Sequence, residues 1–186
     1  AFMRDDRYFV TCASDIMREY NELLVREIQP YMQNVLVELG CGIGDKLIHL
    51  SKVYNPIKVL GGEYTASGVK SAKLLAESSN FNGDFTLFDY NDPNSMSFIQ
   101  TGALVYTSHS IEQIPELRSE FLDELIRKQP KYVIHFEPCY GDQDSKSLIG
   151  LMRRKYIEVN DYNRNLIDLL SEYENRGLIK IISHKK

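Results

Sequence analysis

The sequence predicts a single α/β domain in which a mainly parallel, twisted sheet carries helices on both faces, giving three layers. Short apolar runs alternate with helical patterns along almost the whole chain, and this alternation is typical of a parallel sheet. The chain has 186 residues, of which 43% are hydrophobic and 26% are charged, as expected for one soluble domain with its own core. We find no repeat or linker, so residues 1–186 are expected to form one unit.

The expected elements follow from the period of the apolar residues. Helices are expected at residues 14–28, 46–54, 65–78, 115–128, 145–157 and 161–176. Strands are expected at residues 35–39, 57–60, 84–88, 103–107, 132–136 and 178–183. Thr65 is expected to cap its helix, and Asn160 or Asp161 to cap the last one, because short polar side chains accept from the first N–H groups. Pro115 suits a first helical turn, and Gly61-Gly62 are expected to end the second strand.

Composition argues against several classes of protein. The net charge is −4 without a block of like charges, so we expect no nucleic-acid partner. The number of cysteines is odd and none lies in a C-x-x-C pair, which favours a reducing cytoplasm over a disulfide framework or a zinc site. No apolar run is long enough to cross a bilayer, no signal peptide is visible, and no dense metal-ligand spacing stands out. Nothing predicts the oligomeric state.

A glycine-rich segment follows the first buried strand. Gly40, Gly42 and Gly44 have the spacing G-x-G-x-G rather than the dinucleotide fingerprint G-x-G-x-x-G. Such a turn at a helix start lets a ligand approach the backbone closely, here around Cys41. Glu38 precedes the turn and would repel a pyrophosphate but attract a cation. An ordinary glycine turn after a core strand is the alternative.

Acidic residues also end the next two strands. Glu63 can accept hydrogen bonds from ribose hydroxyls, and Tyr64 beside it can stack on a nucleobase. Asp89 can accept from an adenine amino group, with Tyr90 next to it. Ser108 follows the fourth strand and is expected in the same site. Each acid alone reads equally well as a solvated turn residue, but together they indicate a nucleoside site at one sheet edge.

This pattern resembles the class I (Rossmann-like) S-adenosylmethionine-dependent methyltransferase family, over about residues 33–137. The resemblance rests on Glu38-Leu39-Gly40-Cys41-Gly42-Ile43-Gly44, then Glu63, then Asp89. It implies a Rossmann-like domain that binds S-adenosyl-L-methionine and releases S-adenosyl-L-homocysteine. It further implies that Gly40 and Gly42 line the methionine part, Glu63 the ribose and Asp89 the adenine. That family usually ends in an antiparallel strand pair, of which the sequence offers only 178–183.

Two side chains are candidates for catalysis. His109 and Glu137 follow the fourth and fifth strands, so both could face the transferred methyl group. Methyl transfer needs alignment of acceptor, methyl group and sulfur, and a base can assist a hydroxyl or amine acceptor by taking its proton. His109 suits this role because the pKa of histidine lies near neutrality. A loop histidine bonded to backbone is an equally good interpretation.

The acceptor is expected to meet helices after the fifth strand, in residues 138–176, while residues 1–30 would form a helical lid. Candidate substrate contacts are Tyr156, Asn160, Tyr162 and Asn163. Alternatively, these polar residues only cap a helix and form its solvated face. These segments are also similar to bacterial methyltransferases that modify surface polysaccharides, including capsular O-methyl phosphoramidate.

The sequence therefore predicts O-methylation of a small polar or sugar- or phosphoramidate-type acceptor. Two other functions stay open: a nicotinamide (NAD)-dependent oxidoreductase and a non-catalytic nucleoside-binding domain. The NAD interpretation is disfavoured by the glycine spacing and by Glu38, although Glu63 would serve either cofactor.

Overall fold

A computed structural model describes residues 2–4 and 7–185, with side chains from residue 10 onward. Its centre is a five-stranded sheet in the order β5-β4-β3-β6-β7, and every pairing in it is parallel. The strands are β3 (Val35–Leu39), β4 (Lys58–Glu63), β5 (Asp84–Leu87), β6 (Leu104–Ser108) and β7 (Tyr132–Phe136). The predicted α/β fold with a parallel sheet is confirmed.

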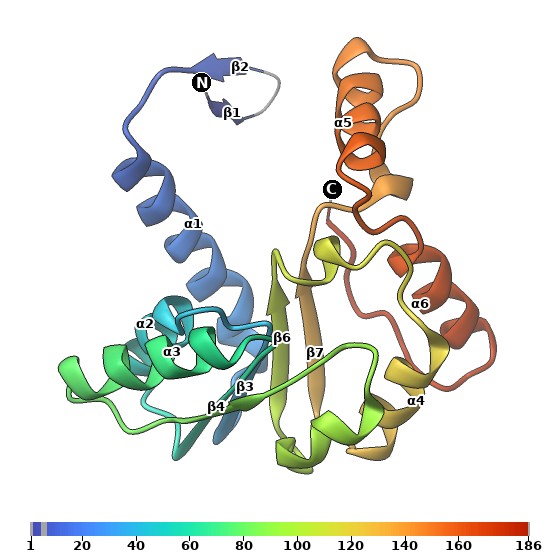
Figure 1. The fold of residues 1–186 in the computed structure, drawn as a ribbon. Helices are drawn as coiled ribbons and strands as arrows, with labels where there is room; N and C mark the ends of the chain where they lie inside the picture. Colours follow the sequence, from blue (N-terminus) through green and yellow to red (C-terminus); the bar gives the residue numbers. More distant parts are fainter. Residues whose placement is uncertain (1, 5–6, 186) are drawn as a thin grey trace.

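Helices cover both faces of this sheet, as predicted (Figure 1). The α-helices are α1 (Ala13–Ile28), α2 (Asp45–Tyr54), α3 (Ala66–Ser78), α4 (Ser119–Arg127), α5 (Leu148–Val159) and α6 (Leu166–Asn175). Short 3₁₀ turns are η1 (Gln29–Tyr31), η2 (Pro93–Phe98), η3 (Ile111–Gln113) and η4 (Tyr140–Asp142). One core joins α1, α2 and α3 to the sheet, and the other joins η2, α4 and α6 to its opposite face.

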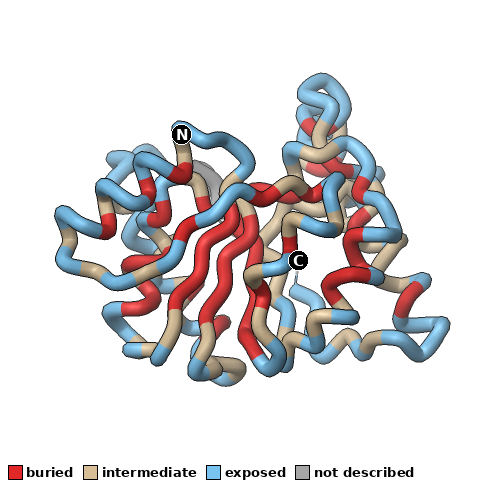
Figure 2. The backbone as a smooth tube through the Cα atoms, turned by 60° about the horizontal axis from the view of Figure 1, so that its bottom comes forward, coloured by how far each residue is buried: buried red, intermediate tan, exposed pale blue. Residues whose placement is uncertain are grey.

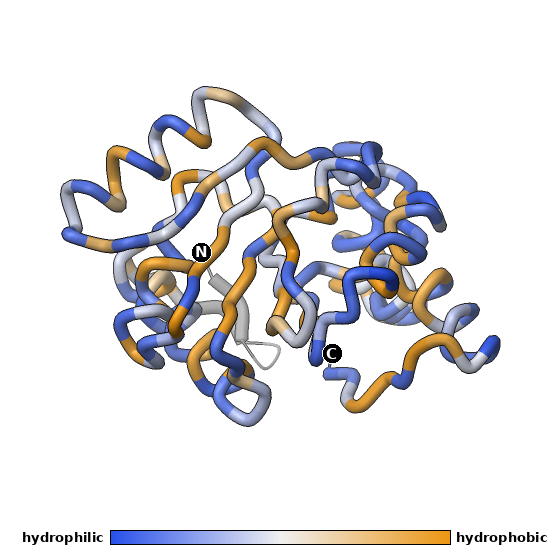
Figure 3. The backbone as a smooth tube through the Cα atoms, turned by 90° about the horizontal axis from the view of Figure 1, so that it is seen from below, coloured by the Kyte–Doolittle hydropathy of each residue, from blue (hydrophilic) through white to orange (hydrophobic). Residues whose placement is uncertain are grey.

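The two cores follow from alternation along the central strands. In β3, Leu36 packs into one core while Val37 and Leu39 pack into the other. Successive strand side chains point to opposite faces, so a strand covered on both faces reads as a continuous apolar run. The buried middle strands are flanked by helices whose outer residues are exposed, and hydropathy follows the same division (Figures 2 and 3).

The chain reverses its direction of travel across the sheet between β3 and β6. The crossover through α2 leads from β3 to β4, whereas β6 lies on the other side of β3. Such a switch point leaves a crevice outside the carboxyl ends of the two strands, where α/β folds bind ligands. The glycine turn after β3 and the segment after β6 both lie there.

Two segments extend beyond this end of the sheet. Helix α5 projects above the carboxyl ends of β6 and β7, and the start of α1 projects on the opposite side (Figure 1). Before α1, β1 (Phe2–Arg4) and β2 (Arg7–Phe9) form an antiparallel pair. The helix expected at residues 14–28 is present as α1, but the first part of the expected helical lid forms these short strands, and residues 1, 5 and 6 lie outside the described chain.

Residues 178–183 do not form the predicted strand. The N–H of Ile181 donates to the Glu174 carboxylate at 2.7 Å instead of to a neighbouring strand, and Ile182 stays 59% exposed. The segment then reaches other parts of the molecule through two ion pairs, His184 with Asp142 and Lys185 with Glu27. Within the described residues, the outer edge of β7 has no paired strand.

Two predicted helices begin later than expected, and asparagine side chains bond the backbone at the start of each. Leu117 exchanges two hydrogen bonds with the Asn165 side chain, both of 2.9 Å, so α4 begins at Ser119 and Pro115 stays in the loop. The last helix begins at Leu166, where Asn163 accepts from the first N–H.

Three smaller expectations have mixed outcomes. Asn160 ends α5 rather than capping α6, and Asp161 adopts a left-handed conformation with φ 51°. Gly61 and Gly62 lie inside β4 rather than ending it. Thr65 does cap α3, accepting from the N–H of Gly68. Among residues 2–4 and 7–185, no helix has the length and apolarity needed to span a membrane.

Candidate functional site

The glycine turn after β3 adopts a conformation that suits glycine. Gly40, Gly42 and Gly44 have φ angles of 72°, 55° and 77°, in the region that other residues avoid. A Cβ on Gly40 would lie 2.3 Å from the Ser110 Cβ, so this position is closely packed. A Cβ on Gly42 would meet nothing within 4 Å. The turn therefore presents bare backbone to open space at Gly42.

The turn is anchored to the neighbouring strand. The N–H groups of Gly40 and Cys41 both donate to the Gly62 carbonyl, at 2.8 and 2.9 Å. The Cys41 side chain is buried in the core shared with α2 and α3, and burial raises the pKa of its thiol. The thiol of Cys41, a predicted cofactor contact, therefore faces the core and is not available to a ligand.

Glu38 is fully buried in β3, below the glycine turn. Its Oε2 accepts from the Tyr106 hydroxyl at 2.8 Å, whereas its Oε1 has no hydrogen-bond partner among the described residues. Burial raises the pKa of Glu38 to about 8, and the nearby Lys46 and the Tyr106 hydroxyl oppose this shift. A buried carboxylate oxygen without a donor normally indicates a missing partner.

Glu63 ends β4 beside the glycine turn. Its Oε2 accepts from the Gly42 N–H at 3.1 Å, and its Oε1 accepts from the backbone and hydroxyl of Thr65. The carboxylate therefore joins the two loops that follow β3 and β4. Tyr64 next to it is 70% exposed, so its ring is free to contact a ligand.

The predicted residues after β5 divide into two groups. Asp89 is half-buried and its Oδ1 accepts from the Asn91 N–H at 2.8 Å. Tyr90 is buried instead, and its hydroxyl donates to the Leu39 carbonyl at 3.1 Å and contacts the Ser110 hydroxyl at 2.7 Å. Tyr90 thus stabilises the end of β3, where the glycine turn begins, and is not exposed to a ligand.

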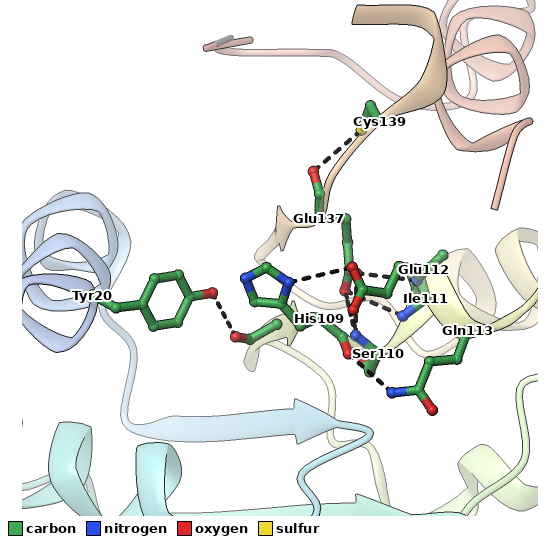
Figure 4. A network of polar contacts seen from close by, with 9 residues as sticks. Tyr20, His109, Ser110, Ile111, Glu112, Gln113, Glu137 and Cys139 are labelled. Atoms are coloured by element: carbon green, nitrogen blue, oxygen red, sulfur yellow. Dashed lines mark hydrogen bonds and ion pairs between the residues drawn. The ribbon is translucent and has the colours of Figure 1, made fainter. Parts of the chain in front are cut away.

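The segment after β6 carries His109, also in a left-handed conformation with φ 53°. Its Nδ1 lies 3.3 Å from the Glu112 carboxylate, and this hydrogen bond raises the pKa of His109 although partial burial opposes the shift. Its ring lies 5.3 Å from the Tyr20 ring of α1. Tyr20 also hydrogen-bonds the buried Ser108 hydroxyl at 2.7 Å, so α1 meets this segment directly (Figure 4).

Glu137 holds the same segment against β7. Its carboxylate accepts from three successive backbone N–H groups, those of Ser110, Ile111 and Glu112, at 3.1 to 3.2 Å (Figure 4). Burial raises the pKa of Glu137, while these hydrogen bonds act in the opposite direction. The geometry gives Glu137 a positioning role for the His109 segment, and its predicted catalytic role remains a prediction.

The predicted substrate residues also lie in two places. Tyr156 and Tyr162 form an edge-to-face pair, with ring centroids 5.8 Å apart, and line a cavity of about 490 Å³ beside Pro138. Asn160 is exposed and bonds the Tyr156 carbonyl. Asn163 is buried, and its amide donates to the Ile114 carbonyl at 2.8 Å, which ties the end of α5 to the segment after β6.

Sequence reasoning missed Tyr106 in this site, and it gave no individual role to Ser110 or Glu112 in the segment after β6. Tyr106 lies opposite Glu38 in the parallel register of β3 and β6, a pairing that becomes visible only once strand order is known. Glu112 lies three residues after His109 in a short 3₁₀ turn, which has no periodic pattern in the sequence. Among the described residues, no cluster of histidine, cysteine and carboxylate side chains suits a metal ion.

Comparison with known proteins gives structural matches only. No family model and no curated protein matches the chain. Geranyl diphosphate C-methyltransferase from Streptomyces coelicolor A3(2), in complex with Mg²⁺, geranyl diphosphate and S-adenosyl-L-homocysteine, is similar with a TM-score of 0.61. Sequence identity is 15%, over 87% of this chain and 61% of that protein.

Two other methyltransferases are also similar. Coclaurine N-methyltransferase, bound to N-methylheliamine and S-adenosyl-L-homocysteine, matches with a TM-score of 0.54 and 17% identity, over 69% of this chain and 36% of that one. The tRNA (uracil-54, C5)-methyltransferase of Pyrococcus abyssi, in complex with S-adenosyl-L-homocysteine, gives 0.50 and 17%, over 62% and 28%. The chain thus spans well under two thirds of their lengths. The fold is that of class I S-adenosylmethionine-dependent methyltransferases, and nothing distinguishes a polysaccharide-modifying subgroup.

Proposed function

We propose that this protein transfers the methyl group of S-adenosyl-L-methionine to an oxygen atom of a small acceptor. The observation that carries the proposal is the free Oε1 of Glu38, buried under a turn of left-handed glycines. The bound donor would supply a methyl group activated by its sulfonium. Every other part of the mechanism falls to the side chains and backbone of this chain.

The donor side suits a cationic nucleoside. Glu38 would attract an ammonium or sulfonium group, directly or through water, and would be ionised by it. Bare backbone at Gly42 would let the methionine part approach closely. Glu63 would accept from ribose hydroxyls with the lone pairs that Gly42 and Thr65 leave free, and Asp89 would accept from the adenine amino group.

The acceptor side would be organised around His109. A hydroxyl acceptor loses its proton as the methyl group arrives, and His109 would take that proton at Nε2 because Nδ1 faces Glu112. Glu137 would keep His109 aligned by fixing the backbone after it. The start of α1, with Tyr20, would cover the acceptor as part of the proposed lid.

The acceptor itself is proposed from chemistry alone. Tyr156, Asn160 and Tyr162 carry hydrogen-bonding groups, and an oxygen nucleophile on a sugar- or phosphoramidate-type molecule would suit them. Capsule polysaccharide biosynthesis in the cytoplasm would be one such setting. The three similar proteins described above are a C-methyltransferase, an N-methyltransferase and a tRNA methyltransferase, so the fold does not decide the acceptor.

The test compares cofactors by thermal unfolding and calorimetry. Saturation with S-adenosyl-L-homocysteine at about 100 times its Kd should stabilise the folded state by about 2.7 kcal/mol. This corresponds to a rise in Tm of about 5–10 °C for a chain of this size. NAD should produce no rise, because the G-x-G-x-G spacing departs from the dinucleotide fingerprint and Glu38 offers no positive charge to a pyrophosphate. A rise with NAD alone would support the oxidoreductase instead.

A third possibility is a domain that binds the nucleoside without catalysis. Replacing His109 with Ala and Glu137 with Gln separates this case. The proposal expects methyl transfer to fail in the variants while S-adenosyl-L-homocysteine still binds. Unchanged biological function of both variants in cells would favour the non-catalytic domain.

A further inference from the structure

The cavity beside Pro138 is connected to the proposed methyl-transfer site through bonded neighbours. Pro138 follows Glu137, whose carboxylate holds the backbone of the His109 segment. On the other side, the N–H of Asn163 donates to the Glu112 carbonyl at 2.8 Å. The cavity walls are thus attached to the segment that carries His109. The lining residues are Pro138, Gln143, Ile149, Met152, Arg153, Tyr156, Ile157 and Tyr162.

Most of this lining is apolar or aromatic. Ile149, Met152 and Ile157 contribute aliphatic and thioether surface from α5, and Tyr156 and Tyr162 contribute ring faces and edges. Met152 and Tyr156 remain 59% and 61% exposed, so apolar surface at the cavity stays uncovered in the protein alone. A wholly polar acceptor would leave that surface in contact with water or desolvate its own polar groups against it.

A single cation faces this apolar lining. Helix α5 carries three consecutive basic residues, and two of them have partners. Arg154 donates to the Gln143 carbonyl at 3.0 Å and stacks on the Tyr140 ring, and Lys155 pairs with Glu158. Arg153 lines the cavity and has no hydrogen-bond or ion-pair partner within the described part of the chain. A guanidinium left free beside apolar walls is suited to a planar or tetrahedral anion.

We propose that this cavity binds an acceptor with an anionic group, a carboxylate or a phosphate, attached to an apolar body. Arg153 binds the anion, and Met152, Ile149 and the tyrosine pair contact the apolar part. This inference rests on the proposed methyltransferase function and narrows its acceptor. The expected acceptor is then not a small, wholly polar sugar. It is an amphiphilic molecule that carries an acidic group, as a phosphoramidate does.

The experiment uses n-octyl phosphate as the probe, below its critical micelle concentration, with the whole chain saturated in S-adenosyl-L-homocysteine. Octyl glucoside supplies the same apolar chain without charge, and inorganic phosphate supplies the charge alone. A charge-assisted hydrogen bond contributes about 1.5–3 kcal/mol, which is about 10- to 100-fold in affinity. Octyl phosphate should therefore bind at least about tenfold more tightly than either control ligand.

Variants separate a specific contact from general electrostatics. Arg153→Gln should reduce the affinity for octyl phosphate about tenfold or more and leave that for octyl glucoside within about twofold. Lys155→Gln is the matched control, because it removes the same charge from the same helix outside the cavity lining. Met152→Ala should weaken both octyl ligands. Unfolding curves of each variant establish that it is folded. The conservative variant Arg153→Lys should retain part of the affinity for octyl phosphate.

Three results would overturn the inference. Equal affinities for octyl glucoside and octyl phosphate would show that the cavity does not recognise an anionic group. Equal losses of affinity in the Arg153 and Lys155 variants would show that general surface charge, not a contact with Arg153, attracts the ligand. Binding only above the micelle concentration would indicate adsorption on the exposed α5 face. If S-adenosyl-L-homocysteine itself does not bind, the proposed function fails; if it binds but octyl phosphate does not, this inference alone fails.

Discussion

Glu38 is the residue whose environment departs furthest from the ordinary. It is fully buried in the central strand, one of its oxygens bonds Tyr106, and the other has no partner within the described residues. An ionised carboxylate in this position is destabilised by the loss of water, which is why its pKa is raised to about 8. A cationic ligand would reverse that effect.

This environment predicts that binding of S-adenosyl-L-homocysteine releases a proton from Glu38. At pH 7 the free protein holds the carboxyl mainly protonated, since its pKa lies near 8, and the ligand ammonium favours the ionised form. Affinity should therefore rise between pH 6 and pH 8, by at most about tenfold per pH unit. Calorimetry in buffers with different ionisation enthalpies measures the proton directly. Glu38→Gln should bind more weakly and without this pH dependence; a proton count of zero for the unaltered protein would contradict the assignment.

The glycine turn predicts a separation of stability from binding. Gly42→Ala should destabilise the fold by only about 1–2 kcal/mol, the strain of a left-handed alanine, because no atom lies within 4 Å of the new Cβ. The Cβ should nevertheless exclude the cofactor from the bare backbone. Gly102→Ala is a matched control, with φ 78° and equally open surroundings at the other end of the sheet. Equal cofactor affinities in the two variants would show that Gly42 does not contact the cofactor.

His109 and Glu112 predict a shifted pH profile. Because the Glu112 carboxylate raises the pKa of His109 above 6.5, a basic His109 becomes available only at a higher pH. The rate of methyl transfer should rise with pH through that raised pKa. Glu112→Gln removes the hydrogen-bonded charge, lowers the pKa, and should move the rising limb to lower pH. The exposed Glu116→Gln should leave the limb in place, and identical profiles for both variants would exclude His109 as the base.

At the scale of elements, strand β7 and the turn η3 act as one unit. Three backbone N–H groups at the start of η3 donate to Glu137, which lies just beyond the last residue of β7. Such N–H groups have no intrahelical partners, so the carboxylate satisfies donors that would otherwise need water. The position of His109 depends on this connection.

Replacing Glu137 with Gln should loosen the segment rather than remove a catalytic group alone. Glutamine keeps one acceptor oxygen but turns an NH₂ group towards the same donors, which should cost about 1.5–3 kcal/mol of stability. Amide exchange at residues 110–112 should accelerate together with the loss of activity, while cofactor affinity changes little. Unchanged exchange with lost activity would instead identify Glu137 as a direct participant in catalysis.

At the scale of the whole molecule, order should decrease outward from the centre of the sheet. Strands β3 and β6 are paired on both sides, β7 on one side, and residues 178–185 join no strand. Besides a backbone hydrogen bond from Leu178 to Tyr173 and partial packing of Ile179 on the core, this segment is held by an exposed carboxylate and two ion pairs. Surface ion pairs contribute only about 0–1 kcal/mol each. The last segment is therefore weakly attached to the domain.

Native-state hydrogen exchange should reproduce this order. Amides of β3 and β6 should exchange most slowly, those of β7 faster, and those of residues 178–185 fastest. Lys185→Ala and His184→Ala should accelerate exchange in the last segment only. Protection of residues 178–185 equal to that of β7 would show that this segment does pair as a strand in solution.

How far the sequence predicts this molecule depends on the range of the interactions involved. The β3 strand, the glycine turn and the Thr65 cap arise from neighbours in sequence, and these were predicted. The start of α4 depends on Asn165, 48 residues away from Leu117, and no local pattern reveals that contact. The link between Glu137 and the Ser110 backbone likewise spans 27 residues, so the sequence places both near the site without showing that they bond.

The switch point between β3 and β6 also divides the chain into two consecutive blocks, one before β6 and one from β6 onward. Nearly all donor contacts proposed for Glu38, the glycines, Glu63 and Asp89 come from the block before β6, whereas His109, Glu137 and the α5 cavity come from the block after it. A chimaera joined in the turn at Gly102, at the opposite end of the sheet, would keep the proposed donor residues together only if Tyr106 and Ser110, which contact Glu38 and Gly40, are retained after the junction. Such a chimaera would test whether the block after this turn selects the proposed acceptor.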